Sequence, residues 1–271
     1  MFIFVWYIEG KNERVNMPME INRVELKERS KDLIARSKPS VISAGLIYLV
    51  LNLLFILLLL RLLTMNYTIT GLQQYAEYLQ EGNNEYAAIV KARMAPPAYT
   101  PLINLLLGFV LSLVGNGFTL FLINTVRGTG ACYGNLLDAF PLFFKFFLLN
   151  LLTTIFVILW SLLLCFPGLV ASYRYRMAPY ILLNNPEKSV MECIRESKQR
   201  MAGYKGHLFV LDLSFIGWNI LISIPIVGLI AQIWIMPYMC LTYVLFYEKL
   251  YGGDIYAADR GLEFPPPPID Y

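Results

Sequence analysis

The sequence predicts an all-α, polytopic membrane protein with six transmembrane helices. Three observations lead to this fold class. The 271 residues are 57% hydrophobic and 15% charged, with a mean hydropathy of +0.55, whereas an ordinary soluble domain carries roughly 25% charged residues. Long apolar runs recur along the chain, and one sequence pattern occurs twice. We therefore expect lipid to be the solvent for most of the apolar surface.

The duplicated pattern consists of a tryptophan, two prolines and a tyrosine, and the two copies are separated by 58 residues. Its members are Trp160, Pro167, Pro179 and Tyr180 in the first copy, and Trp218, Pro225, Pro237 and Tyr238 in the second. Each copy reads as an apolar arm, a proline-containing turn and a second apolar arm. We therefore predict a tandem pair of like-oriented helical hairpins. For the tryptophans and tyrosines, packing and interface anchors are favoured over a binding cage.

The chain begins with an N-terminal extension, residues 1–21. Its apolar start lacks a preceding basic stretch and a following cleavage site, so it does not resemble a signal peptide. Residues 22–38 then predict a basic amphipathic helix, and Asn22 with Glu25 forms a capping-box-like start. Two interpretations stay open: a helix on the inner membrane surface, or a solvated helix that sets topology.

The six-span membrane domain is predicted over residues 39–251, because about 20 apolar residues cross the ~30 Å hydrocarbon core. The approximate spans are 41–63, 101–126, 144–166, 169–185, 208–226 and 228–248. The fourth contains Arg174 and Arg176 and is the least apolar. The fifth and sixth lie in a run that carries no charge from residue 213 to 247, which is too long for one crossing. We expect this run to fold back around Pro225–Gly228.

The connecting segments carry further signals. Within the polar segment 66–100, Gly82-Asn83-Asn84 is predicted to separate two short helices. The glycine-rich loop 127–141 lacks the Lys-Ser/Thr of a phosphate-binding loop, which favours a plain connection.

A second basic helix is predicted over Glu187–Met201, capped by Asn184-Asn185 with Pro186 at its first position. Residues 252–271 are predicted to form a cytoplasmic proline-rich tail. In the second span, three glycines would let a neighbouring helix approach closely: Gly108, Gly115 and Gly117.

The distribution of basic residues predicts the orientation. The presumed inner segments hold 17 Lys and Arg residues, and the presumed outer segments hold two, Lys91 and Arg93. Cytoplasmic loops carry an excess of Lys and Arg. We therefore expect a multi-pass protein of the cell membrane with both termini in the cytoplasm, and with anionic lipid headgroups as partners of its inner face.

One stretch resembles a known family. It runs PGLVASYRYRMAPYILLNNPEKSVMECIRESKQRMAGYKGHLFVLDLSFIGW over residues 167–218, and IMPY and FYEKLY follow. These motifs are similar to those of bacterial integral membrane proteins grouped as a domain of unknown function, number 975. The resemblance covers roughly residues 22–251. It implies a six-span membrane protein, mainly of Gram-positive bacteria, and no established activity, so it carries over no catalytic residues.

Four polar residues near or within the spans are the candidate ligand-binding residues: Arg174, Arg176, Asp212 and Gln232. Ionisable groups at membrane depth cost about 2.5–3.5 kcal/mol on insertion scales, so they usually face protein or a water-filled cavity. The 58-residue offset makes Gln232 the counterpart of Arg174, which suggests a shared site between the hairpins. The alternative is that Arg174 reaches the headgroups and Gln232 forms an interhelical hydrogen bond. Arg174 and Arg176 are expected on nearly opposite sides of one helix.

An enzyme is the least favoured of the function classes, because no acid pair, nucleophile–base pair or metal-ligand set lies at membrane depth. The single histidine, His207, and four cysteines at separate positions predict no metal site and no disulfide framework. We expect no cofactor and no nucleic-acid partner. The favoured hypothesis is a non-catalytic membrane scaffold or accessory subunit with a membrane-protein partner or a second copy of itself. The alternative is a carrier or efflux-type protein for an amphipathic or anionic solute or lipid.

Overall fold

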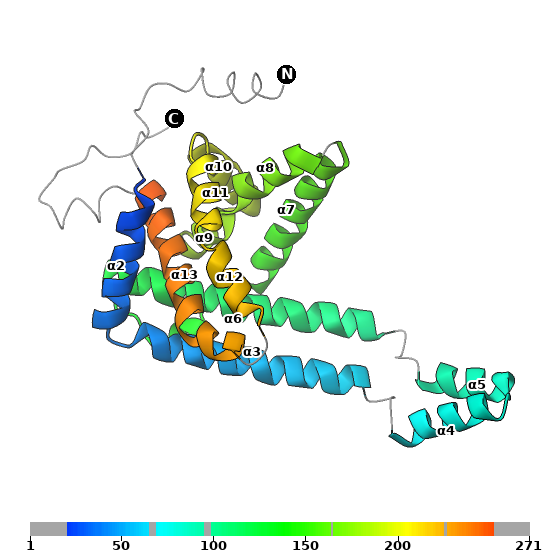
Figure 1. Cartoon of the computed structure of the whole chain (residues 1–271). Helices are drawn as coiled ribbons and strands as arrows, with labels where there is room; N and C mark the ends of the chain where they lie inside the picture. The colour runs from blue at the N-terminus through cyan, green and yellow to red at the C-terminus, as the bar shows by residue number, and fades with distance from the viewer. Residues whose placement is uncertain (1–20, 65–68, 95–98, 164, 225–226, 252–271) are drawn as a thin grey trace, which may run out of the picture. The chain divides into compact units, whose positions relative to one another are not determined.

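The computed structural model describes residues 21–64, 69–94, 99–163, 165–224 and 227–251, and these contain helices and no strand (Figure 1). The all-α class is therefore confirmed for this part of the chain. The α-helices are α2 (Arg23–Arg36), α3 (Val41–Thr64), α4 (Ile69–Gln80), α5 (Asn84–Met94), α6 (Thr100–Arg127), α7 (Phe143–Leu163), α8 (Cys165–Tyr175), α9 (Ala178–Asn184), α10 (Val190–Arg200), α11 (Lys205–Leu213), α12 (Ile216–Ile222) and α13 (Val227–Tyr251). Two 3₁₀ helices, η1 (Tyr133–Leu136) and η2 (Phe140–Leu142), connect α6 to α7. Most of the N-terminal extension, the tail and Pro225 lie outside the described residues.

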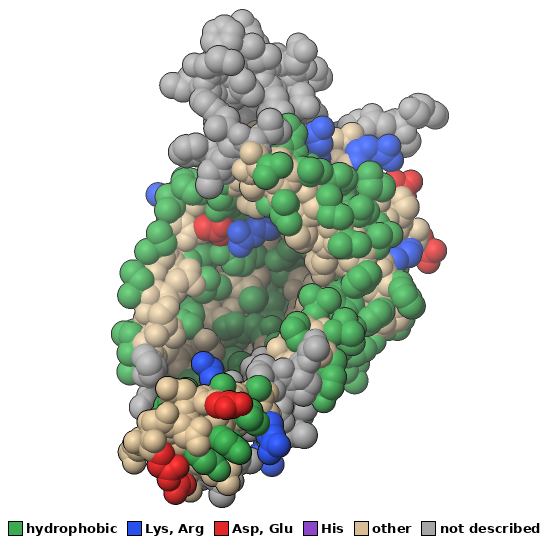
Figure 2. Space-filling view, turned by 90° about the vertical axis from the view of Figure 1, so that its right-hand side faces the viewer, with side chains coloured by type: hydrophobic (Ala, Val, Ile, Leu, Met, Phe, Trp, Pro, Cys, Tyr) green, Lys and Arg blue, Asp and Glu red, His purple; other side chains and the backbone are tan. Residues whose placement is uncertain are grey.

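Among the described residues, four helical segments are long and apolar enough to cross a membrane, and a fifth exists if the bent pair α11–α12 counts as one span. The four are Val41–Leu58, Thr100–Arg127, Tyr133–Leu162 and Val227–Tyr251. Their apolar side chains are widely exposed; Leu54 on α3 and Ile158 on α7 are each 58% accessible. Hydrophobic side chains also dominate the face in Figure 2. Exposed apolar surface of this extent fits a lipid environment.

The predicted fourth and fifth spans are each interrupted. The segment predicted as 169–185 is divided into α8 and α9 by a turn at residues 176–177, and the segment predicted as 208–226 bends by 46° between α11 and α12. The two copies of the repeat differ at their second proline. Pro179 lies in the first turn of α9, where a missing N–H leaves no bond unmade. Pro237 lies inside the continuous helix α13 and packs closely against Gly45 of α3.

The chain divides into two compact units, residues 47–112 and the remainder. In the smaller unit α4 packs against α5. Gly82 connects them with a φ of 72°, a left-handed conformation that glycine adopts without strain. The predicted break at Gly82-Asn83-Asn84 is confirmed.

In the larger unit α2 lies beside α13, as the blue and orange helices of Figure 1 show. Leu26 is fully buried in α2, and the Ser30 hydroxyl lies 2.9 Å from that of Thr242. The Asn22 half of the predicted capping box is present, because Asn22 Oδ1 accepts a hydrogen bond from the Val24 N–H at 3.0 Å; the Glu25 carboxylate accepts from Lys249. The buried stripe of α2 therefore faces protein.

Three glycines allow close packing within this unit. A Cβ on Gly117 of α6 would lie 2.0 Å from the Leu136 carbonyl oxygen of η1. A Cβ on Gly168 would lie 1.9 Å from Ser161 Oγ, and one on Gly228 would lie 1.9 Å from a carbonyl oxygen at the end of α12. The close approach predicted for Gly117 is present, although its neighbour is a 3₁₀ turn. At Gly108 a Cβ would meet no described atom within 4 Å.

Helix α10 begins three residues later than predicted. Pro186, Glu187 and Lys188 precede it, and Ser189 is its N-cap. The Ser189 hydroxyl accepts from the Glu192 N–H at 3.3 Å, while the Glu192 carboxylate accepts from the Ser189 N–H at 2.8 Å. This reciprocal capping box satisfies two N–H groups, whereas a cap at Asn185 would place Lys188, whose side chain has no acceptor, three residues on.

Candidate functional site

The structure brings two of the four candidate residues into direct contact, Arg176 and Asp212. The Arg176 Nη1 atom lies 2.8 Å from Asp212 Oδ2. Two tyrosine hydroxyls also donate to the carboxylate, Tyr173 to Oδ2 at 2.8 Å and Tyr243 to Oδ1 at 2.7 Å. The guanidinium carbon lies 5.0 Å from the centre of the Tyr243 ring and 5.8 Å from that of Tyr173. We call these four residues the Asp212 cluster.

The cluster joins three helices that lie far apart in the sequence. Tyr173 comes from α8, Asp212 from α11 and Tyr243 from α13. Arg176 lies in the turn after α8, so its direction does not follow the periodicity of that helix. The expectation that Arg174 and Arg176 lie on opposite sides of one helix assumed a continuous span, and the break after Tyr175 removes that basis.

The other two candidates lie outside the Asp212 cluster. The Arg174 carbonyl accepts a hydrogen bond from the Ser197 hydroxyl of α10 at 2.9 Å, and the Arg174 Nε atom is buried. Gln232 is half-buried on α13 and takes part in none of the cluster's contacts.

The geometry of the Asp212 cluster is that of a closed polar contact. Arg176 and the two hydroxyls supply three donors to the two carboxylate oxygens. The side chains are 40% exposed for Arg176 and 21% exposed for Asp212, so protein covers the ion pair only in part. An anion that binds Arg176 would compete with the Asp212 carboxylate for the guanidinium. The cluster therefore holds α8, α11 and α13 together, and its cation is already neutralised.

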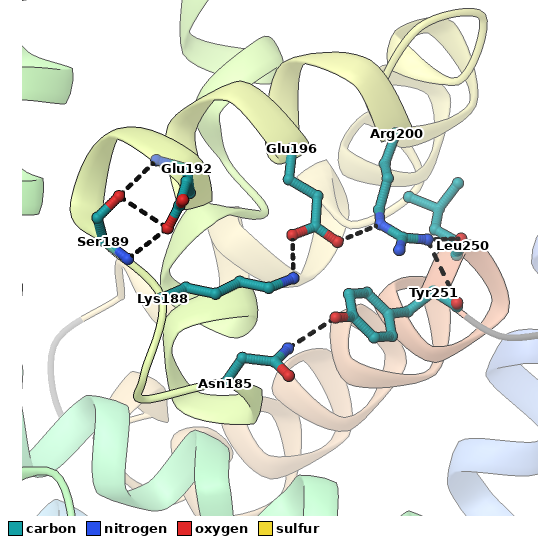
Figure 3. A network of polar contacts seen from close by, with 8 residues as sticks. All are labelled: Asn185, Lys188, Ser189, Glu192, Glu196, Arg200, Leu250 and Tyr251. Carbon is teal, nitrogen blue, oxygen red and sulfur yellow. Dashed lines mark hydrogen bonds and ion pairs between the residues drawn. The ribbon is translucent and has the colours of Figure 1, made fainter. Parts of the chain in front are cut away.

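A second polar cluster surrounds the C-terminal end of α13 (Figure 3). Arg200 of α10 donates to the carbonyls of Leu250 and Tyr251 at 3.4 and 3.3 Å, and its guanidinium carbon lies 4.0 Å from the centre of the Tyr251 ring. The Asn185 amide donates to the Tyr251 hydroxyl at 2.7 Å. The last carbonyls of a helix have no intrahelical donor, and a cation near them is favourable. Arg200 therefore caps α13 from another helix.

Glu196 orients Arg200. It accepts from Arg200 Nε at 2.9 Å and from Lys188 Nζ at 2.6 Å. Burial by itself would raise the pKa of Glu196, but the hydrogen bonds and charges of Lys188 and Arg200 outweigh it and hold that pKa below its usual value. Burial would lower the pKa of Lys188, and its contact with Glu196 raises it overall. Both groups are therefore held in their charged forms.

Two further ion pairs tie the same end of α13 to the start of α2 and the end of α6. Lys249 Nζ lies 3.1 Å from Glu25 Oε2, and Arg127 Nη2 lies 2.8 Å from Glu248 Oε1. Arg127 also donates to the Asn184 side chain at the end of α9. The ends of α2, α6, α9 and α13 are thus joined by charged and amide groups.

Comparison with known protein families bears on this part of the chain. Residues 162–253 match the DUF975 family. That family is described as a protein of unknown function, and it is the one that the motifs resemble, so the resemblance is confirmed over this segment. The DUF975 segment contains both polar clusters. The match does not extend to residues 22–161, which the resemblance included.

No curated protein and no solved structure matches the chain. The match to DUF975 over residues 162–253 therefore supplies a similarity to a family of unknown function and no activity. Among the described residues, no group of three or more His, Cys, Asp and Glu side chains lies close enough to hold a metal ion.

Sequence reasoning missed the tyrosines of the Asp212 cluster and the polar cluster at the end of α13. A signal for the second was present, because FYEKLY places two charged residues and a tyrosine directly after an apolar run. The two tryptophans of the repeat are exposed to similar extents, Trp160 at 41% and Trp218 at 43%. Tyr180 and Tyr238 instead pack on the aromatic rings of Tyr247 and Phe215.

Proposed function

We propose that the chain crosses the cell membrane six times, with both termini in the cytoplasm, and acts as a non-catalytic scaffold or accessory subunit. Its hairpins, α7 with α8–α9 and α11–α12 with α13, would be inserted in the same direction. The number of crossings and the role rest on different observations.

Polar contacts of the segment that includes Pro186, Lys188 and Arg200 support six crossings. If α7 crosses the membrane, its two ends lie on opposite sides. Near the start of α7, Lys145 donates to the carbonyls of Pro186 and Lys188, the latter at 3.3 Å. The chain has therefore returned to the side on which α7 began by the time it reaches Pro186. We assign the return crossing to α8–α9, the helical segment between these points, although it is not among the described helices that are long and apolar enough to cross a membrane.

The same reasoning applies to α11–α12. Arg200 of α10 contacts the C-terminal end of α13, so these two points lie on one side. Helix α13 has 25 residues, about 37 Å, enough to cross the bilayer. A crossing between Arg200 and the start of α13 is then required, and α11–α12 supplies it. The pair Glu25–Lys249 adds that α2 lies on the side where α13 ends, which requires an even number of crossings.

The distribution of Lys and Arg residues also supports six crossings. If only α3, α6, α7 and α13 crossed, the segment 164–226 with its seven Lys and Arg residues would lie outside. That arrangement opposes the usual excess of Lys and Arg in cytoplasmic loops. With six crossings, five of these residues lie on the inner side.

Labelling of single cysteines tests the topology. In a variant without the native cysteines, Lys198→Cys on α10 and Glu81→Cys after α4 are treated with a membrane-impermeant maleimide, in intact and in permeabilised cells. Six crossings predict labelling of Glu81→Cys in intact cells and of Lys198→Cys only after permeabilisation. Lys31→Cys on α2 is the inner-side control. Labelling of Lys198→Cys in intact cells would support four crossings instead.

The scaffold role is supported by the closed state of the Asp212 cluster, where cation, carboxylate and hydroxyls satisfy one another. A transport site would need polar groups free to meet a solute. A structure in lipid nanodiscs tests the role. A dry contact among α8, α11 and α13 supports the scaffold. A hydrated cavity, or lipid-like density that touches Arg174 and Gln232, would favour a carrier for an anionic or amphipathic solute.

A further inference from the structure

We propose that the pocket between the C-terminal end of α2 and the loop after α6 binds a phosphate group, with Arg36 and Lys38 as its cationic ligands. The pocket has a volume of about 340 Å³. Its lining includes Arg36, Lys38, Asn124, Thr125, Gly128 and Gly130. This volume lies at the low end of the range for small-molecule sites and suits a phosphate or glycerophosphate.

The charged side chains of the lining favour an anion. Two cations and no carboxylate line the pocket. Among the described residues, no ion pair involves Arg36 or Lys38. This distinguishes them from Arg127, Arg176 and Arg200, each of which is paired with a carboxylate. Arginine matches the geometry of phosphate oxygens with paired N–H donors, and lysine adds a point charge.

The neutral groups of the lining give the pocket a fixed wall. The Asn124 amide donates to Asn135 Oδ1 at 3.2 Å, and the Thr125 hydroxyl donates to the Phe121 carbonyl at 2.8 Å. The loop that follows contains Gly128 and Gly130 with φ of 68° and 85°, a conformation in which most side chains are strained. A glycine at these points keeps the rim without side chains. Such a loop lets an anion approach the backbone.

A phosphate could reach this pocket from a lipid headgroup or from solution. The lipid source rests on the proposed function, because that topology brings the ends of α2 and α6 to the inner leaflet, where basic pockets between helices bind anionic headgroups. The free-phosphate source needs no membrane. A measurement in neutral detergent therefore tests the pocket even if the topology is wrong.

The test compares two double variants of the full chain. Arg36→Gln with Lys38→Gln removes the pocket cations. Arg23→Gln with Lys31→Gln removes two exposed cations of the same helix, with the same change in net charge. Binding is measured at 0.3 M NaCl, where general surface attraction is strongly screened. Retention of phosphatidylglycerol over phosphatidylcholine is read by native mass spectrometry, and the effect of inorganic phosphate against chloride is read by thermal unfolding in neutral detergent.

We expect the pocket variant to retain phosphatidylglycerol about 30-fold less well, from about fivefold for each basic residue, and the control to change less than about threefold. Stabilisation of the native chain but not the pocket variant by inorganic phosphate would identify free phosphate as sufficient. An effect of the lipid alone would identify the headgroup. Equal losses in both double variants, or none in either, would overturn the proposal. Arg36→Lys, which keeps the charge, should retain most of the binding and guards against a folding defect.

Discussion

Replacement of Asp212 is the sharpest test of the contacts that hold the DUF975 segment together. Asp212→Ala leaves the Arg176 cation without its carboxylate and removes the acceptor of two tyrosine hydroxyls. Hydrogen bonds to a charged group are worth about 1.5–3 kcal/mol each. The ion pair itself is partly exposed and contributes at most about 1 kcal/mol. With the lower value for each tyrosine, we expect the free energy of unfolding to fall by about 3–4 kcal/mol.

Asp212→Asn tests the contribution of the negative charge separately from that of the hydrogen-bond acceptor. The amide keeps one acceptor oxygen and loses the negative charge, so we expect about half of that loss. Unfolding is measured by denaturant titration in mixed micelles, with the free energy taken from the linear dependence on denaturant. Asp32→Ala, which removes an exposed carboxylate of α2, is the control and should stay within about 0.5 kcal/mol.

A double-mutant cycle provides the result that would refute this reasoning. Arg176→Met combined with Asp212→Asn should cost about 1 kcal/mol less than the sum of the single variants, because each removes the same interaction. If the single effects add within about 0.5 kcal/mol, Arg176 and Asp212 are not coupled. The ion pair would then not be what joins the end of α8 to α11, and the Tyr173–Asp212 hydrogen bond would be the remaining contact of the cluster between them.

Three other changes test separate contacts. Gly117→Ala forces a Cβ into a backbone carbonyl of η1 and should destabilise the chain by about 1–3 kcal/mol in the same titration, whereas Gly108→Ala in the same helix should be neutral or slightly stabilising. The pKa of Glu196 is lower in the folded chain than its usual value of 4.5. Its contribution to the free energy of unfolding is therefore complete above pH 4.5 and is lost as the pH falls through the folded pKa. Glu196→Gln should flatten this acid limb of the stability–pH curve, and an unchanged limb would contradict the pairing. If Arg174 acts only as an anchor, Arg174→Lys should leave expression and unfolding unchanged, while loss of a cellular phenotype on Arg174→Ala with normal expression would favour a carrier.

The comparison of α8 with α13 shows where sequence reasoning stopped. Both segments follow the proline-containing turn of the repeat, and their apolar content predicts a span in each case. Whether the helix continues through its second proline depends on the surroundings. Pro237 lies within the continuous helix α13 and packs on Gly45 of α3. Pro179 instead lies in the first turn of the separate helix α9, after the turn at Arg176. A repeated sequence pattern specifies local preferences but not the neighbours that override them.

The candidate site shows the same limit. Arg176 and Asp212 were recognisable as costly charges near or within the spans. Their pairing was not, because it depends on a break in α8 and on how α11 packs against it. Gln232 was inferred from the 58-residue offset alone, and a shared offset does not imply contact when the two copies are built differently.

The sequence by itself determined the helical class, the apolar segments, the DUF975 resemblance and the asymmetry of charge, since these depend on composition and spacing along the chain. The cap at Asn22 and the break at Gly82 are local features, so the sequence also predicted them. Only the tertiary structure decided which charges meet: Arg176 with Asp212, Glu25 with Lys249, and Arg200 with the end of α13. These partners are separated by 36, 224 and 51 residues. Their meeting depends on how the helices pack in three dimensions, which no local pattern encodes.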